Sequence, residues 1–380
     1  AFSTINSSLE ELSRITGLRP KHEIKHDLIK RSELKQFLED RIEEEIDPKE
    51  VQAEELALKK FGFVPQDFNL IKTTVDLMTE QAAAFYDYRK KKLFLLEGAS
   101  AVEHQTVLVH ELAHALADQH FNLGKFLRRG KNDDATLARM AVMEGQATWL
   151  MYELMAQRMG QSLKEAAWMI DRMNDASDSV SESYPVLRGA PLYLKASLLF
   201  PYKQGLQFHQ SIVEKMGSKA FAEVFRNPPA TTQQVLHPEK YLHELKPTVP
   251  ELPLVPGASR YSTLIEGTLG EFDHSVLLEQ YLSKDESRQL APKWRGGVFE
   301  LLEHKKNKRS VLRYASIWED RESAEKMFAA YKAILKGKWK NMRIAAETGD
   351  SLSGEGDDGY FYLRLAGTTV SSVEGLESRE

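Results

Sequence analysis

The stretch VLVHELAHALADQH, residues 107–120, decides the fold that we predict, because it holds His110, Glu111 and His114 in the pattern HExxH. On an α-helix, two histidines four residues apart come to the same face, about 5 to 6 Å from each other. Two imidazoles at that spacing can share one zinc ion, and the glutamate beside them can take a proton from the zinc's water. The pattern therefore predicts a zinc site on a helix, with Glu111 as the base.

Composition narrows the classes of function. The chain has 380 residues, of which 42% are hydrophobic and 28% are charged, as in a globular protein with two domains or one large one. The net charge of -5 gives no indication of a nucleic-acid partner, and no apolar run is long enough for a transmembrane segment. Because the chain has no cysteine, only histidine and carboxylate side chains can hold a metal.

The chain begins AFSTINSSLEEL, without a methionine and without a charged and apolar leader. This start fits a mature chain after signal removal, and it fits a chain trimmed for expression equally well. We favour a secreted or periplasmic location, with a cytoplasmic location as the alternative.

The segment before the HExxH motif predicts a small antiparallel sheet. A helix-like segment ends near Gln81 and is followed by a β-hairpin with strands at 85–88 and 93–96. The S-x-x-E capping box at 100–103 then begins a helix that should run from 101 to 121. An edge strand beside this helix could pair with an extended peptide.

The segment after the motif predicts further helices. A long helix from about residue 135 to 159, capped by Asp134, carries Glu144 in MEGQATW. Helical patterns follow at 163–173 and 192–216. The polar stretch between them, residues 174–186, is either a surface connection or a cover over a cleft.

The fold class that we predict is α+β, a mainly helical metallopeptidase domain with a smaller C-terminal module. Residues 1–64 are mostly helical and belong with the catalytic core at 65–246, and the Pro-rich segment 247–262 is the linker. Residues 263–380 predict an α+β module. Its strands are expected at 297–304, at 310–318, in NMRIAAE and in GYFYLRLAGTTVSSV, and Asp320 is expected to cap its amphipathic helix.

The third ligand of the zinc is expected to be Glu144 rather than His120. A catalytic zinc usually has three protein ligands and one open position. His120 matches the metzincin spacing HExxHxxGxxH, but Ala117 replaces the glycine that lets the chain turn back. The helix therefore continues and carries His120 about 9 Å along the axis, away from the site. Glu144 can be delivered from a second helix that packs against the first.

Around these residues the sequence resembles the gluzincin branch of the zincin zinc metallopeptidases, the thermolysin-like clan. The third ligand of that family is a glutamate on a downstream helix, commonly followed by glycine and then a small residue, and Glu144, Gly145 and Ala147 match. The resemblance covers about residues 83–150 and extends loosely through LHPEKY. It is closest to uncharacterised bacterial zincin-like proteins.

One position departs from the family. Thermolysin-like enzymes have an aspartate four residues after the glutamate ligand, where it orients a zinc histidine, and this chain has Thr148 there. Asp118, Thr148 or a backbone carbonyl is expected to take that role.

The function that we expect is zinc-dependent hydrolysis of a peptide or protein substrate. His110, His114 and Glu144 would hold one Zn²⁺, and Glu111 would activate its water. The alternative is a catalytically inactive zincin-like binding or structural protein. The intact Glu111 argues against that alternative, because an inactive site has no need of a base.

The tetrahedral oxyanion of such a reaction needs a donor besides zinc. His237 is the first candidate, and Tyr241 or Tyr202 is the next, because each lies after the metal-binding helices. The competing interpretation is that His237 is a turn residue and that the two tyrosines only pack.

Overall fold

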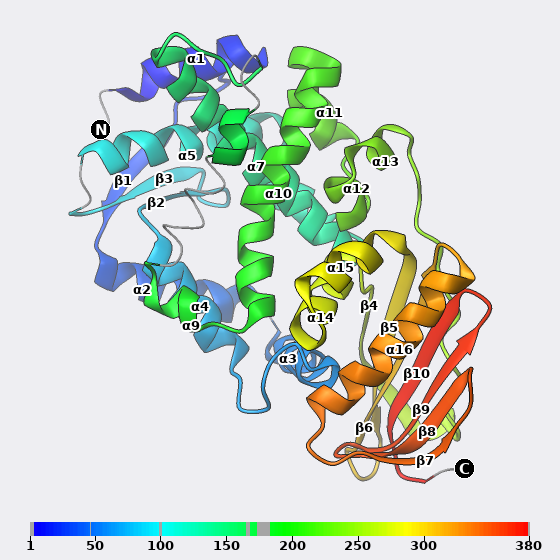
Figure 1. Ribbon diagram of the computed structural model, residues 1–380. Coiled ribbons are helices and arrows are strands. Elements are labelled where there is room, and N and C mark those ends of the chain that lie inside the picture. The colour runs from blue at the N-terminus through cyan, green and yellow to red at the C-terminus, as the bar shows by residue number, and fades with distance from the viewer. Residues whose placement is uncertain (1–3, 46, 99–100, 165–167, 173–182, 379–380) are drawn as a thin grey trace.

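A computed structural model of the chain describes residues 4–45, 47–98, 101–164, 168–172 and 183–378. Its described part is a mixed α+β fold with a small sheet at one end, a large sheet at the other, and the long helix α10 between them (Figure 1). Among the described helices, none combines the length and the apolar character that a membrane span requires. The predicted α+β class is confirmed.

The first part of the chain forms the small sheet and most of the helices. Its elements are α1 (Ile5–Thr16), β1 (Lys25–Ile29), α2 (Arg31–Glu45), α3 (Pro48–Phe61), α4 (Leu70–Gln81), β2 (Ala84–Asp87), β3 (Lys92–Leu96), α5 (Ala101–Phe121), α6 (Leu123–Arg128), α7 (Asp133–Arg158), α9 (Pro185–Gly189), α10 (Leu192–Met216), α11 (Ala220–Arg226), α12 (Thr232–Leu236) and α13 (Pro238–Leu242).

The second part forms the large sheet with three helices. Its elements are β4 (Tyr261–Gly267), α14 (Glu271–Tyr281), α15 (Lys284–Leu290), β5 (Trp294–His304), β6 (Ser310–Trp318), α16 (Arg321–Lys338), β7 (Arg343–Glu347), β8 (Ser351–Gly356), β9 (Gly359–Ala366) and β10 (Thr369–Leu376).

The small sheet has the order β1-β3-β2, and the predicted hairpin is its β2–β3 pair. The expectation of a purely antiparallel sheet is wrong, because β1 pairs parallel to β3. Three helices lie between β1 and the hairpin, and a parallel pair needs such a long connection. This order leaves β2 at the edge of the sheet, on the side that faces α5.

The helices α5, α7 and α10 agree with the sequence to within a few residues, whereas the helix predicted at 163–173 is described as helical only at 168–172, with a turn at 163–164. α5 spans the whole predicted range, and Ser100 of the expected capping box lies outside the described residues. The cap of α7 is Asn132, whose side chain accepts a hydrogen bond from the backbone N–H of Ala135. The predicted cap Asp134 instead lies inside the helix, where its carboxylate accepts hydrogen bonds from Thr232. Most of the stretch 174–186, up to residue 182, lies outside the described residues.

The large sheet is antiparallel, with the order β4-β5-β6-β10-β9-β8-β7. GYFYLRLAGTTVSSV, expected only to be strand-like, is a hairpin of β9 and β10. Gly367 turns this hairpin with a φ of 61°, a conformation that glycine adopts without steric cost. α16 covers one face of the sheet with the predicted apolar side, including the buried Met327 and Tyr331 (Figure 1).

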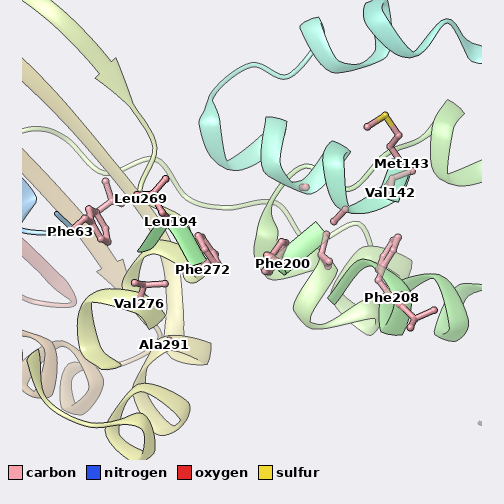
Figure 2. Packing of buried hydrophobic residues seen from close by; sticks show 14 of the residues in the cluster. Phe63, Val142, Met143, Leu194, Phe200, Phe208, Leu269, Phe272, Val276 and Ala291 are labelled. Atoms are coloured by element: carbon pink, nitrogen blue, oxygen red, sulfur yellow. The ribbon is translucent and has the colours of Figure 1, made fainter. Parts of the chain in front are cut away.

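The two ends of the molecule share one hydrophobic core. Figure 2 shows this core around Phe200 of α10 and Phe272 of α14. The centroids of these two rings are 5.0 Å apart. From the N-terminal region, Phe61 of α3 makes an edge contact with Phe299 of β5. The Pro-rich segment lies along the large sheet, where the N–H of Thr248 donates to a carbonyl of β5. The predicted domain limits therefore stay a prediction, because the hydrophobic core extends across them. These limits are 1–64, 65–246, 247–262 and 263–380.

Two glycines let α7 and α10 approach closely. A Cβ atom on Gly145 of α7 would lie 2.2 Å from the carbonyl carbon of Gly205 and 2.6 Å from its Cα. A Cβ on Gly205 of α10 would lie 2.3 Å from the carbonyl oxygen of Ala141. Real side chains do not reach such distances to backbone atoms, so only glycine permits this crossing. Gly145 directly follows Glu144, and the crossing therefore fixes where the glutamate sits relative to α10.

We expect Gly145→Ala to lower the free energy of unfolding by about 2 kcal/mol, because overpacking costs typically 1–3 kcal/mol and exceeds the gain in helix propensity of about 1 kcal/mol. Urea unfolding followed by circular dichroism measures this change. Gly189→Ala is the matched control, because a Cβ there meets nothing within 4 Å. Equal stability of the two variants would contradict the close crossing.

Candidate metal centre

His110, His114 and Glu144 lie together between α5 and α7. The Nε2 atoms of the two histidines are 3.0 Å apart, and each is 3.1 Å from Oε2 of Glu144. Both histidine side chains are buried, at 11% and 9% exposed, and the glutamate side chain is 12% exposed. In the described part of the chain, these residues form the one group of three whose atoms could hold a metal ion. They are the three ligands that the sequence predicts.

With Glu144 ionised, no arrangement of protons on the two imidazoles satisfies the three contacts of this triangle. An imidazole nitrogen is either a donor, when it carries a proton, or an acceptor, when it does not. Two protonated nitrogens would point their N–H groups at one oxygen and leave the contact between the rings repulsive. Protonation of only one ring leaves another contact without a proton. A cation at the centre would accept a lone pair from all three atoms, so the donor set fits a metal ion.

The dimensions of the triangle also fit zinc. Tetrahedral zinc has bonds of about 2.0–2.1 Å to nitrogen and oxygen, which places its ligand atoms roughly 3.3 Å from one another. The observed edges of 3.0 and 3.1 Å are a few tenths of an ångström shorter. Two imidazoles and one carboxylate are a ligand set found in catalytic zinc sites, which keep the fourth position open.

The charge of Glu144 is stabilised by its two neighbours. Burial raises the pKa of its carboxyl, but the charges of His114 and His110 and their hydrogen bonds outweigh burial and hold this pKa well below its usual value. The carboxylate is therefore ionised, as a metal ligand must be.

Glu111 is held by the hairpin in front of α5. Its Oε2 accepts a hydrogen bond of 2.6 Å from the backbone N–H of Tyr86 in β2. Burial raises the pKa of the Glu111 carboxyl to about 7, although the charge of His110 and the Tyr86 N–H oppose this effect. A carboxyl group with a pKa near neutrality can both take and return a proton.

A second contact fixes the hairpin to α5. The hydroxyl of Tyr86 donates to Oδ2 of Asp118, which also accepts from Nζ of Lys91, and Oδ1 of Asp118 accepts from the N–H of Leu123. Both oxygens of Asp118 thus have partners other than a zinc histidine. The hydroxyl of Thr148 is buried without a hydrogen-bond partner among the described residues. In the described part of the chain, neither Asp118 nor Thr148 hydrogen-bonds His110 or His114, so the group that orients the histidines stays a prediction.

A pocket of about 520 Å³ opens onto the metal cluster and Glu111. Its walls come from α4, the β2 edge, α5, the start of α6, α7 and α10. Most of the side chains around the polar centre are apolar, among them Leu77, Met78, Met143, Met151, Leu198 and Leu206. The pocket can therefore hold an apolar group beside the cluster.

The structure brings Tyr202 to this pocket. Its ring stacks on the ring of His110, with the centroids 6.0 Å apart, and it lines the pocket together with Glu144. The Glu144 charge, together with burial of the hydroxyl, raises the pKa of Tyr202 well above its usual value. The hydroxyl therefore keeps its proton and can donate it in a hydrogen bond. The side chain as a whole is 39% exposed.

His237 and Tyr241 do not line this pocket, and the expectation that either lies at the site is corrected. Nε2 of His237 is 2.7 Å from Oε1 of Glu271, because this histidine sits between α12 and α13, which pack near the start of α14. The hydroxyl of Tyr241 donates to the carbonyl of Asn227. Nε2 of His120 is 2.8 Å from the carbonyl oxygen of Arg19, so this histidine is also away from the cluster.

The sequence analysis missed the roles of Tyr86 and Asp118 in holding Glu111. Tyr86 lies in a hairpin strand whose side chains alternate between the two faces of the sheet. Nothing in such a pattern shows which helix residue its backbone N–H will reach. The lysine cluster in the turn between β2 and β3 was a signal in the sequence for a carboxylate partner of the hairpin, because Lys91 pairs with Asp118.

Comparison with known proteins covers only the C-terminal part of the chain. Residues 260–380 match the family described as Domain of unknown function (DUF8575). No curated protein and no solved structure matches the chain. The match begins at β4 and takes in the whole large sheet. The metal cluster lies outside the matched residues.

We expect Glu144→Ala to weaken zinc binding at least a hundredfold, because it removes one of three ligands and leaves two histidines. Zinc content after dialysis and titration with a fluorescent zinc chelator measure this change. His120→Ala, on the same helix as the two histidines but away from them, should bind zinc like the wild type. Weaker zinc binding by His120→Ala than by Glu144→Ala would contradict the ligand assignment.

Proposed function

We propose that this protein is a zinc-dependent peptidase whose site is similar to that of the gluzincin zinc metallopeptidases. The observation that carries the proposal is the convergence of three ligand atoms within 3.1 Å of one another, next to Glu111, on the wall of one pocket. A site that only stored or transported metal would not require a buried carboxylate beside the ligands.

His110, His114 and Glu144 would hold the zinc through Nε2, Nε2 and Oε2. Zinc at this position supplies a Lewis acid that acidifies water and stabilises negative charge on oxygen. The carboxylate reduces the net charge of the centre by one, and burial of all three ligands keeps bulk water away from them.

Glu111 is the general base in this proposal. It takes a proton from the water molecule whose oxygen attacks the peptide carbonyl carbon. It then returns this proton to the amide nitrogen as the carbon–nitrogen bond breaks, so the products are a carboxylic acid and an amine. The Tyr86 N–H fixes one carboxylate oxygen and leaves the other for the proton.

Tyr202 is the oxyanion donor in this proposal. Its pKa is raised, so its hydroxyl carries a proton, and its ring lies against that of a proposed zinc ligand. A preorganised donor of this kind stabilises the negative charge that develops on the carbonyl oxygen.

The substrate class follows from the pocket wall. Edge strand β2 lines the pocket together with apolar side chains from five helices. An extended peptide could pair with the strand while an apolar side chain next to the scissile bond enters the pocket. We therefore propose a preference for apolar residues at that position.

Glu111→Gln should retain zinc and lose at least a hundredfold in kcat, because general base catalysis contributes typically 10²–10⁴-fold. Cleavage of casein and of a fluorogenic peptide library with apolar centres measures the activity, and elemental analysis measures the zinc. His120→Gln is the matched control and should cleave like the wild type. A wild-type protein that is fully loaded with zinc and cleaves nothing would instead support the inactive binding protein.

Tyr202→Phe should lower kcat about a hundredfold with little change in KM, because loss of one oxyanion donor costs about 10²–10³. Tyr241→Phe removes a hydroxyl that bonds Asn227 away from the pocket and should leave kcat unchanged. The steady-state kinetics of the same fluorogenic peptides check both variants. A larger loss in Tyr241→Phe than in Tyr202→Phe would overturn this role for Tyr202.

A further inference from the structure

A second pocket, of about 690 Å³, lies where α9 and α10 meet α14 and the start of α15. We call it the basic pocket, because four of its lining residues are cationic and only one is acidic. The cations are Arg188 of α9, Lys195 and Lys203 of α10, and Lys284 of α15, and the acid is Glu279 of α14. The chain as a whole carries a net charge of -5, so this concentration of positive charge is local.

Three of the four cations have no carboxylate partner in the described part of the chain. These three are Arg188, Lys195 and Lys284, and no ion pair among the described residues involves any of them. Nζ of Lys195 is 3.3 Å from the carbonyl oxygen of Arg188, so α9 holds this lysine at the wall of the pocket. Three unpaired cations around one hollow raise the local concentration of anions.

The basic pocket adjoins the pocket of the metal centre. Both are lined by Leu199 and Lys203 of α10, and Lys203 directly follows Tyr202. A helix rises 1.5 Å per residue, so Lys195 lies about 10 Å along α10 from Tyr202, and Leu192 lies about 15 Å from it. An extended peptide covers these distances with about three to five residues.

We infer that the basic pocket binds acidic side chains of a peptide substrate, three to five residues from the bond cleaved at the metal centre. This inference rests on the proposed peptidase function. The same two residues of α10 line both pockets, so a ligand in one pocket lies next to the other pocket. This shared wall favours a segment of the substrate over a separate anion as the ligand of the basic pocket. The volume of the basic pocket also exceeds what one small anion needs.

The test measures binding and not cleavage, so it does not depend on turnover. Zinc-loaded Glu111→Gln protein is titrated into fluorescein-labelled peptides of twelve residues, which share one apolar centre. One peptide has three glutamates at its N-terminal end, another has them at its C-terminal end, and in their twins glutamine replaces each glutamate. We expect one acidic peptide to bind about tenfold tighter than its twin in 50 mM NaCl. This advantage should fall several-fold in 500 mM NaCl, since the charges are partly exposed.

Substitutions in the basic pocket test whether the acidic side chains of the peptide bind there. The triple variant Arg188→Gln, Lys195→Gln and Lys284→Gln should bind the acidic and the glutamine peptides equally. The control triple Lys215→Gln, Lys219→Gln and Lys336→Gln changes the net charge by the same amount at exposed positions away from both pockets, and it should keep the advantage. Glu279→Gln should increase the advantage two- to threefold, because it removes the one acidic group of the wall.

Three results would overturn the inference. The first is equal binding of the acidic peptides and their twins, and the second is equal loss of the advantage in the two triple variants. The third is competition by free Glu-Glu-Glu that is as strong as that of the whole acidic peptide, which would assign the basic pocket to a separate ligand. Failure of the peptidase proposal gives a different result, namely a preference for the acidic peptide in Glu111→Gln while the wild type cleaves neither peptide.

Discussion

The close crossing of α7 and α10 at Gly145 and Gly205 is the constraint on which the rest of the site depends. It brings the backbones of two long helices together where a Cβ atom would meet main-chain atoms at less than 2.5 Å. Glu144 precedes the first glycine, and Tyr202 lies one turn before the second. A single contact between helices therefore sets the carboxylate and the phenol relative to each other, and the same helix α10 forms one wall of both pockets.

α5 and the hairpin complete this frame from the other side. The helix presents His110, Glu111 and His114 at fixed spacing, and β2 fixes the glutamate through a backbone N–H. The side chains of the site come from the helices α5, α7 and α10, so none of them lies on a loop. The buried position keeps the polar groups in contact with one another rather than with water, which strengthens each electrostatic interaction. This arrangement is what a metal centre with a built-in base requires.

Local patterns were enough to predict the parts of the site that lie on one helix. The HExxH spacing identified His110, Glu111 and His114, and the missing turn at Ala117 correctly excluded His120 from the cluster. Glu144 was predicted because a second helix could deliver it, and because its surroundings resemble a family motif; the structure adds a physical reason for the glycine after it. Residues in separate segments were harder to place. His237 and Tyr241 follow α5 and α7 in sequence, but they contact Glu271 and Asn227 away from the cluster. The parallel pairing of β1 and the contact between Tyr86 and Asp118 also depend on tertiary packing, which no local pattern encodes.

In the proposed site, one metal ion joins α5 to α7. The most direct measurement is an anomalous difference map at the zinc absorption edge, from crystals of protein purified without chelator and supplied with zinc. We expect a single strong peak bounded by Nε2 of His110, Nε2 of His114 and Oε2 of Glu144. A zinc peak at other residues, or an ordered cluster without a peak, would contradict the proposed site.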